Sequence, residues 1–267
     1  SLDQDEMSLV AKIHKAIAVI QFKVERDLIL RNPHFKLNNR LLLDKIDPKA
    51  KTVNIEGKEY DLLDFNFPTI NFNNDPYKLT LEEHHVMKHL KQLFIHNEML
   101  QKHVKYLFQK GSMHLKVNDT LLFHAAIPLN DDKTFAKQVI DQKEVAGKAL
   151  FEALEKKIRY AYLHRYEKNI DELDYFIYLW QGTNSPLFAK SAMKTFERYF
   201  IKDKAAHKEH MNPYFTLRED ETVLKQIFTD FDLDLSRGKI INGHVPTDIT
   251  RGDEAVLANK RIYLIDG

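Results

Sequence analysis

Cysteine is absent from the 267 residues of this chain. The absence excludes disulfide bonds, a thiolate nucleophile and zinc sites built on cysteine, so any metal ion must be held by His, Asp, Glu or Asn side chains. A cysteine-free protein also fits a reducing compartment. We therefore expect a cytoplasmic protein whose chemistry does not depend on thiols.

An excess of charge of one sign and a long apolar run are lacking as well. Forty Lys and Arg residues offset thirty-nine Asp and Glu residues, which leaves no field that would attract nucleic acid or an anionic membrane. No apolar run approaches the roughly eighteen residues that cross a bilayer. With 43% apolar and 30% charged residues the composition is that of an ordinary globular protein. A polyanionic partner is therefore disfavoured.

The first sixty residues carry one helical pattern and one hairpin pattern. Apolar residues recur at spacings of three and four from Val10 to Leu28, which predicts a helix with one buried stripe that stops near Pro33. Alternating apolar residues on both sides of Gly57 predict a two-stranded hairpin over residues 53–62. A helix followed by a small β element is therefore expected.

A second helix is expected to begin at Thr80. Thr80 with Glu83 three positions later forms a capping-box pattern, and an apolar stripe continues from there to Gly111. The pattern predicts one unbroken helix with a buried side. We therefore divide the chain into a helix-rich accessory region over residues 1–110 and a second part over residues 111–267.

The second part mixes short strands and helices. Residues 113–123 read as a hairpin with its turn at Asn118 and Asp119, and its second strand, residues 121–123, is apolar on both faces and should be central and buried. Helical patterns recur over residues 144–163, 192–204 and 219–231, and short strands are expected at 239–241 and 261–265. The expected fold class is α/β, or α+β within this chain.

Two histidines each follow one of the expected strands. His124 comes directly after residues 121–123, and His244 follows Ile241 through Asn242 and Gly243. A strand end can hold an imidazole rigidly beside a metal ion. Taken singly, such a histidine is more often a structural residue, and the two lie too far apart for a local metal motif. Both readings therefore remain open from the residues alone.

Longer stretches of the sequence resemble the class III fructose-1,6-bisphosphatases. The segments that carry the resemblance are residues 75–80 (DPYKLT), 121–130 (LLFHAAIPLN), 184–188 (NSPLF), 195–200 (TFERYF) and 242–246 (NGHVP). They are collinear with that family and span essentially the whole chain. Such a set of matches is far more specific than any single short motif.

The resemblance implies a calcineurin-like metallophosphatase with an α/β/β/α sandwich, of which this chain would hold part. In that family two divalent metals, usually Mn²⁺, promote hydrolysis of the 1-phosphate of fructose 1,6-bisphosphate in gluconeogenesis. By the same resemblance His124 and His244 correspond to the fourth and fifth ligand-bearing motifs. Weaker candidates for contacts with the sugar phosphate are Asn184, Ser185, Lys190 and Arg198, although charged residues of this kind are usually only solvated.

The sequence also departs from the family pattern. Ala125 and Ala126 replace the Gly-Cys that follows the ligand, and the motifs Gly-Asp-x-His-Gly, Gly-Asp-x-x-Asp-Arg-Gly and Gly-Asn-His-Asp or Gly-Asn-His-Glu are missing. We therefore expect a C-terminal or middle fragment, with the catalytic acid and other ligands upstream of it. Alone it should show negligible phosphatase activity with Mn²⁺, and its truncated sheet should lead either to association into a homo-oligomer or to rearrangement.

Two other functions remain open at this point. A metallophosphatase that acts on phosphoproteins would share the histidine-after-strand arrangement. A non-enzymatic binding or regulatory module would explain the missing ligands, with the apolar stripes of the long helices facing a partner.

Overall fold

The computed structural model describes residues 4–167 and 171–266, and these cluster into two units. The first unit holds residues 4–103 together with 193–208, and the second holds the remaining described residues between 104 and 266. The chain thus leaves the first unit and returns to it for sixteen residues, which no sequence pattern predicted. The expected division at residue 110 stays a prediction, and each unit is described by itself below.

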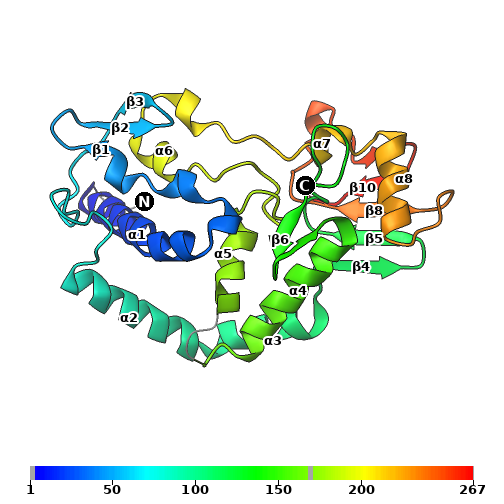
Figure 1. Cartoon of the computed structure of the whole chain (residues 1–267), viewed down its shortest axis with the longest axis horizontal. Helices are drawn as coiled ribbons and strands as arrows, with labels where there is room; N and C mark the ends of the chain where they lie inside the picture. Colours follow the sequence, from blue (N-terminus) through cyan, green and yellow to red (C-terminus); the bar gives the residue numbers. More distant parts are fainter. Residues whose placement is uncertain (1–3, 168–170, 267) are drawn as a thin grey trace. The chain divides into compact units, whose positions relative to one another are not determined.

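The first unit is built on α1 (Gln4–Arg31), which ends before Pro33 as expected (Figure 1). The expected stripe was wrong for much of this helix, because Ile13 is 54% exposed and Val10 is exposed as well. The buried face instead presents Val19 and Phe22 to the aromatic residues of a later helix. Periodicity located the helix correctly but not the face that is covered.

Short elements complete the first unit (Figure 1). The hairpin expected over residues 53–62 is confirmed as β2 and β3, which pair antiparallel, and β1 pairs with β2 at the edge. The elements are η1 (Pro33–Phe35), η2 (Asn38–Arg40), η3 (Leu43–Lys45), β1 (Ile46–Asp47), β2 (Thr52–Ile55), β3 (Lys58–Asp61), α6 (Thr195–Phe200) and η5 (Lys204–His207).

The helix expected from Thr80 to Gly111 is divided in two. The capping box at its start is confirmed, since the Glu83 backbone N–H donates to the Thr80 hydroxyl and the Glu83 carboxylate accepts from the Thr80 backbone. The first helix, α2 (Leu81–His96), ends before Asn97, whose backbone is extended and whose Oδ1 accepts the Leu100 N–H at 2.9 Å. That side chain caps the second helix, α3 (Glu98–Lys110). The prediction of one unbroken helix was therefore wrong.

The apolar stripe of α2 and α3 is also not buried. Within the described part of the chain Leu93 is 54% exposed, and Glu83 is the buried residue of the two helices. Glu83 is buried because Lys23 of α1 reaches its carboxylate at 2.7 Å. A second ion pair buries Arg40 and Glu25, whose side chains form two hydrogen bonds of 2.9 Å. Charge pairs thus connect α1 to its neighbours.

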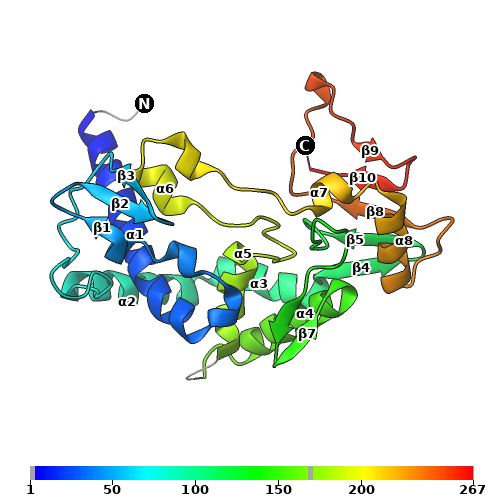
Figure 2. The ribbon, with the colours of Figure 1, turned by 45° about the horizontal axis from the view of Figure 1, so that its top comes forward.

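The second unit contains a five-stranded sheet in the order β4-β5-β8-β10-β9 (Figure 2). Strands β5, β8 and β10 are parallel to one another, and the two edge strands β4 and β9 are antiparallel to their neighbours. The bounds are β4 (His114–Val117), β5 (Thr120–Phe123), β8 (Lys239–Asn242), β9 (Val256–Leu257) and β10 (Ile262–Leu264). The hairpin expected over residues 113–123 is confirmed, with Asn118 in the left-handed turn conformation.

Helices cover one face of this sheet. Phe123 of β5 packs on Phe151 of α4 (Gly147–Leu163), which also contacts Phe231 at the end of α8 (Glu221–Asp230). The remaining elements are β6 (Gln138–Ile140), β7 (Lys143–Val145), η4 (Asp171–Leu173), α5 (Asp174–Gln181), α7 (Tyr214–Leu217) and η6 (Ile249–Arg251). The expected α/β class is confirmed. In the described residues no helix is long and apolar enough to cross a membrane.

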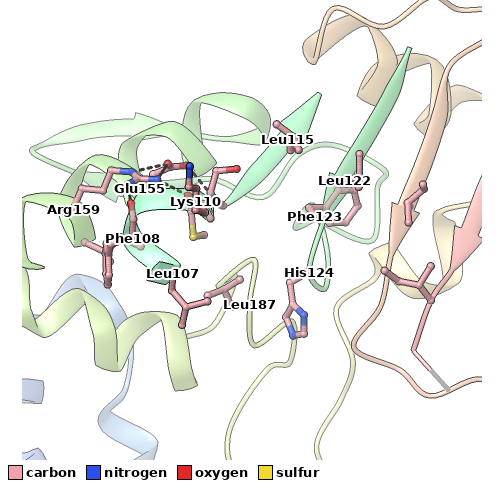
Figure 3. A pocket seen from close by; sticks show the side chains of 16 residues that line it. Leu107, Phe108, Lys110, Leu115, Leu122, Phe123, His124, Glu155, Arg159 and Leu187 are labelled. Carbon is pink, nitrogen blue, oxygen red and sulfur yellow. Dashed lines mark hydrogen bonds and ion pairs between the residues drawn. The ribbon is translucent and has the colours of Figure 1, made fainter. Parts of the chain in front are cut away.

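The opposite face of the sheet is open in the described structure. Leu115 is 52% exposed and Leu122 and Ile241 are half-buried, and together they line a cavity of about 540 Å³. Figure 3 shows Leu115, Leu122 and His124 along one wall of this cavity and Arg159 on the other. The strand at residues 121–123 is apolar on both faces as predicted, but it lies second in the sheet and only one of its faces is covered.

Candidate metal centre

The parallel strands β5 and β8 bring the two predicted histidines together. Because parallel neighbours end at the same edge of a sheet, the residues that follow them share that edge. His124 follows β5 directly and His244 lies two residues beyond β8. The His124 Nε2 and His244 Nδ1 atoms are 3.1 Å apart and share a hydrogen bond whose donor depends on the tautomer. Residues 120 positions apart thus form one pair.

Two hydrogen bonds fix the segments that carry the pair. The Gly243 backbone N–H donates to the His124 carbonyl at 2.8 Å, and the Asn242 side-chain amide donates to the Ala125 carbonyl at 2.9 Å. Asn242 and Ala125 are completely buried, so water does not compete for these bonds. The bonds continue the pairing of β5 with β8 beyond the last strand residues and hold both histidine backbones in register.

A turn after α5 packs against the same segments. Its Ser185 is completely buried, and its hydroxyl donates to the Leu179 carbonyl and accepts the backbone N–H groups of Leu187 and Phe188. A serine hydroxyl offers one donor and two acceptor positions, so all of them are used. The next carbonyl, that of Pro186, accepts the Ala126 N–H at 3.2 Å. Ser185 therefore shapes a turn that is attached to the chain just after His124.

The same turn reaches His244. A hydrogen bond to the Phe188 backbone favours the charged imidazole, and since the Phe188 N–H is already donated to Ser185, the partner is the Phe188 carbonyl. Burial is the largest influence and lowers the pKa of His244, and the nearby His124 and Lys190 lower it further. The imidazole is therefore neutral near pH 7, which is the form that binds metals. A carbonyl on the second ring nitrogen is a common partner of a ligating histidine.

Three of the fourteen described non-glycine residues with left-handed backbones lie in the Ser185 turn or at His244. Asn184 has φ of 62°, Ala189 has φ of 53° and His244 has φ of 77°. Such conformations cost about 1–3 kcal/mol each and persist only where the surrounding structure enforces them. The backbone at the histidine pair is therefore held in shape by its neighbours.

The histidine pair fits part of a metal site. Two nitrogen ligands at about 2.1 Å and at a right angle around one ion are about 3.0 Å apart, and the ring nitrogens of His124 and His244 are separated by 3.1 Å. A metal ion would replace the proton that they share. Among the described residues no group of three or more His, Cys, Asp or Glu side chains is arranged to hold a metal. The pair offers two ring nitrogens, and a complete metal centre needs more ligands.

The other predicted site residues lie in different surroundings. Asn184 and Lys190 line a polar cavity of about 250 Å³ in the second unit, where Lys190 pairs with Glu209 at 2.9 Å. Ser185 lies beneath that surface, completely buried. Arg198 is exposed on α6, which belongs to the first unit. Their assignment to the substrate stays a prediction.

Two residues near the pair were not singled out from the sequence. Asp266 lies one residue beyond Ile265, whose N–H donates to the Asn242 carbonyl, and its side chain is close to Gly243. Its negative charge raises the pKa of His244 against the effect of burial. Phe188 contributes a backbone group, which no sequence pattern reveals. The position of Asp266 after a third parallel strand is the one signal that could have pointed to it.

Comparisons with known proteins show which family this chain belongs to. The family model described as Firmicute fructose-1,6-bisphosphatase matches residues 1–267. The chain belongs to this fructose-1,6-bisphosphatase family. A relative from Alkaliphilus metalliredigens, named fructose-1,6-bisphosphatase class 3, is 47% identical over 268 residues, which cover 99% of this chain and 40% of the relative. The resemblance found in the sequence is therefore confirmed.

Other curated members of the fructose-1,6-bisphosphatase family match over the same extent. The class 3 enzyme of Clostridium tetani is 46% identical over 268 residues and that of Clostridioides difficile 47% over 269 residues, each covering 100% of this chain and 40% of the relative. The chain thus spans about 40% of the length of these relatives. No solved structure matches the chain.

Proposed function

We propose that the protein containing this chain hydrolyses the 1-phosphate of fructose 1,6-bisphosphate, in the cytoplasm and as a step of gluconeogenesis. Membership of the fructose-1,6-bisphosphatase family supports the substrate. The observation that carries the proposal is the 3.1 Å approach of His124 and His244 at one edge of a parallel sheet. Family membership makes the reaction metal-dependent, and we propose Mn²⁺ as the metal.

Bound divalent ions would supply Lewis acidity toward the phosphate oxygens. The role of this chain would be to hold two imidazoles for them, through His124 Nε2 and His244 Nδ1. The Phe188 carbonyl sets the orientation of the His244 ring, and the bonds of Asn242 and Gly243 keep the two backbones together. We place the other ligands and the catalytic acid in the part of the relatives' length that this chain does not span.

The test is hydrolysis by a full-length protein that contains this chain, with Mn²⁺. We expect release of phosphate from fructose 1,6-bisphosphate, and a loss of at least about 100-fold in His244→Ala, because losing an outer-shell partner alone costs up to about that factor. His164→Ala is the matched control, since His164 is a half-buried residue after α4 whose side chain pairs with Glu167. It should keep full activity.

Three outcomes would contradict the proposal. Full activity of His244→Ala would remove the histidine pair from the reaction. Faster hydrolysis of a phosphoserine peptide than of fructose 1,6-bisphosphate would favour the phosphoprotein phosphatase. No turnover of either substrate would favour the non-enzymatic helical module.

A further inference from the structure

A small polar cavity lies beside the candidate metal centre, within the second unit. Its volume is about 250 Å³, below the range of about 300–1,000 Å³ that accommodates drug-sized ligands, so it suits a smaller group such as a monosaccharide. Its polar lining consists of Asn130, Asp131, Thr183, Asn184, Lys190, Ser191 and Asn212. These residues come from four separate segments of the chain.

Internal bonds hold the four segments in place. The buried Asn212 accepts the backbone N–H groups of Leu129 and Tyr214 through its Oδ1, each at 3.0 Å. The Thr183 hydroxyl donates to the Ser191 carbonyl at 2.8 Å. The cavity is therefore formed before any ligand arrives, which lowers the entropy cost of binding.

The charges around the cavity do not favour a phosphate group. Lys190, its cationic residue, is paired with Glu209 at 2.9 Å, and the side chain of Glu209 is only 7% exposed. Asp131 adds a negative charge at the rim. Amide and hydroxyl groups make up the rest, and they both donate and accept hydrogen bonds. This combination suits the hydroxyl groups of a sugar.

Asn184 is the residue best placed to bind the hydroxyl groups of such a ligand. Its backbone is held in the left-handed region with φ of 62°, and within residues 4–167 and 171–266 its side-chain amide has no hydrogen-bond partner. A half-buried amide without a partner at the wall of a polar cavity is available for hydrogen bonds to a ligand.

The cavity adjoins the histidine pair through one short segment. The Pro186 carbonyl accepts the N–H of Ala126, two residues after His124, at 3.2 Å, and Lys190 in the same segment lines the cavity. A ligand in the cavity is therefore next to a group held at the histidines.

We propose that this cavity binds the sugar hydroxyls of the substrate, with the Asn184 amide as a specificity-determining contact, while the phosphate that is removed lies at His124 and His244. The choice of a ketose phosphate as ligand rests on the proposed function. Binding in the cavity itself requires no metal, so it can be measured separately from hydrolysis.

The experiment follows the side-chain amide signals of Asn130 and Asn184 in the ¹⁵N-labelled 267-residue chain without metal. The probes are fructose, fructose 6-phosphate and inorganic phosphate. We expect fructose and fructose 6-phosphate to shift both signals, and phosphate alone to leave them unchanged. Equal shifts with phosphate alone, or no shift of Asn184 with any probe, would overturn the proposal.

Variants give a second, independent result. Asn184→Gly removes the amide and tolerates the positive φ, and it should weaken fructose 6-phosphate binding at least about fivefold, the loss expected from one hydrogen bond. Asn184→Asp should weaken it similarly because the donor is lost. Asn74→Ala, an exposed change in the first unit, is the control and should bind normally. Normal binding by both Asn184 variants would overturn the proposal.

The two proposals fail in different ways. If fructose 6-phosphate binds at Asn184 but the full-length protein does not hydrolyse fructose 1,6-bisphosphate, the sugar site stands and the proposed reaction fails. If hydrolysis proceeds and depends on His244 but not on Asn184, the reaction stands and the sugar site fails.

Discussion

The two units of this chain bury different kinds of polar side chains. In the first unit the buried polar residues include two ion pairs, Lys23 with Glu83 and Arg40 with Glu25. In the second unit they are mostly neutral amides and one hydroxyl, namely Gln138, Gln181, Ser185, Asn212 and Asn242, together with Asp174. Buried charges link helix α1 to its neighbours, whereas the neutral groups shape the loops around the histidine pair and the cavity. In the first unit the buried ion pairs hold α1 against its neighbours. In the second unit the buried neutral groups hold the loops of the candidate site.

Arg40→Met should produce the largest loss of stability. The change leaves the Glu25 carboxylate buried without its two bonds from Arg40, and breaking a buried ion pair costs about 3–5 kcal/mol. The measurement is chemical denaturation of the first unit, followed by amide signals of α1. The double variant Glu25→Leu with Arg40→Met should recover most of the loss, since apolar replacement of both partners is often neutral. If the double variant does not recover stability, the loss in Arg40→Met does not come from the unpaired Glu25 charge.

Ser185→Ala tests the contribution of a buried neutral group in the second unit. It removes the acceptor of two backbone N–H groups and the donor to the Leu179 carbonyl, and unsatisfied buried groups cost about 1–3 kcal/mol. Denaturation measures the loss, and the amide signals of residues 187–189 should move with it. Ser236→Ala, an exposed position, should change stability by less than about 0.5 kcal/mol. Equal stability of the two variants would mean that the turn does not depend on the hydroxyl.

Helix caps offer a smaller effect that should be similar in the two units. Thr80→Ala removes the cap of α2 and Asp220→Ala the cap of α8, and each should cost about 1 kcal/mol. Thr80→Ser should restore the first, because serine keeps the hydroxyl. If Thr80→Ala loses much more stability than Asp220→Ala, the Thr80 cap also supports the ion pair of Glu83 with Lys23.

The smallest effect concerns pH. Burial lowers the pKa of His114, which packs edge-on against Phe151 and Phe231, so the folded chain favours its neutral form. Its contribution to stability is present above the ordinary histidine pKa of about 6.5 and is lost as the pH falls through its lower folded value. His114→Phe should flatten the fall in stability between about pH 7 and pH 5. Burial also lowers the pKa of His34 in the first unit. The same pH dependence measured at His34 therefore compares the two units. An unchanged slope in His114→Phe would contradict this assignment.

Local sequence patterns predicted where helices and strands lie better than they predicted which faces are buried. The hairpin around Gly57 and the capping box at Thr80 were predicted because each depends on residues only a few positions apart. The break at Asn97 was missed because an asparagine within an apolar stripe carries no strong stop signal. Its capping bond to Leu100 appears only once α3 has formed.

The candidate site could not be predicted from local patterns alone. Each strand before His124 and His244 could be predicted, but their parallel pairing joins segments more than a hundred residues apart, and no local pattern encodes it. The family resemblance supplied that link. The turn of Ser185 and the Phe188 carbonyl could not be predicted, because they act through the backbone rather than through a residue type.

The measurement that tests the account most directly is a titration of the ¹⁵N-labelled chain with Mn²⁺, followed at the histidine ring nitrogens. Mn²⁺ is paramagnetic and broadens the signals of the groups that bind it. We predict that the signals of His124 and His244 broaden first and together, and that His244→Ala abolishes the effect at His124. Broadening of the exposed His85 and His89 on α2, with His124 and His244 unchanged, would contradict the claim that these two imidazoles form part of a metal centre.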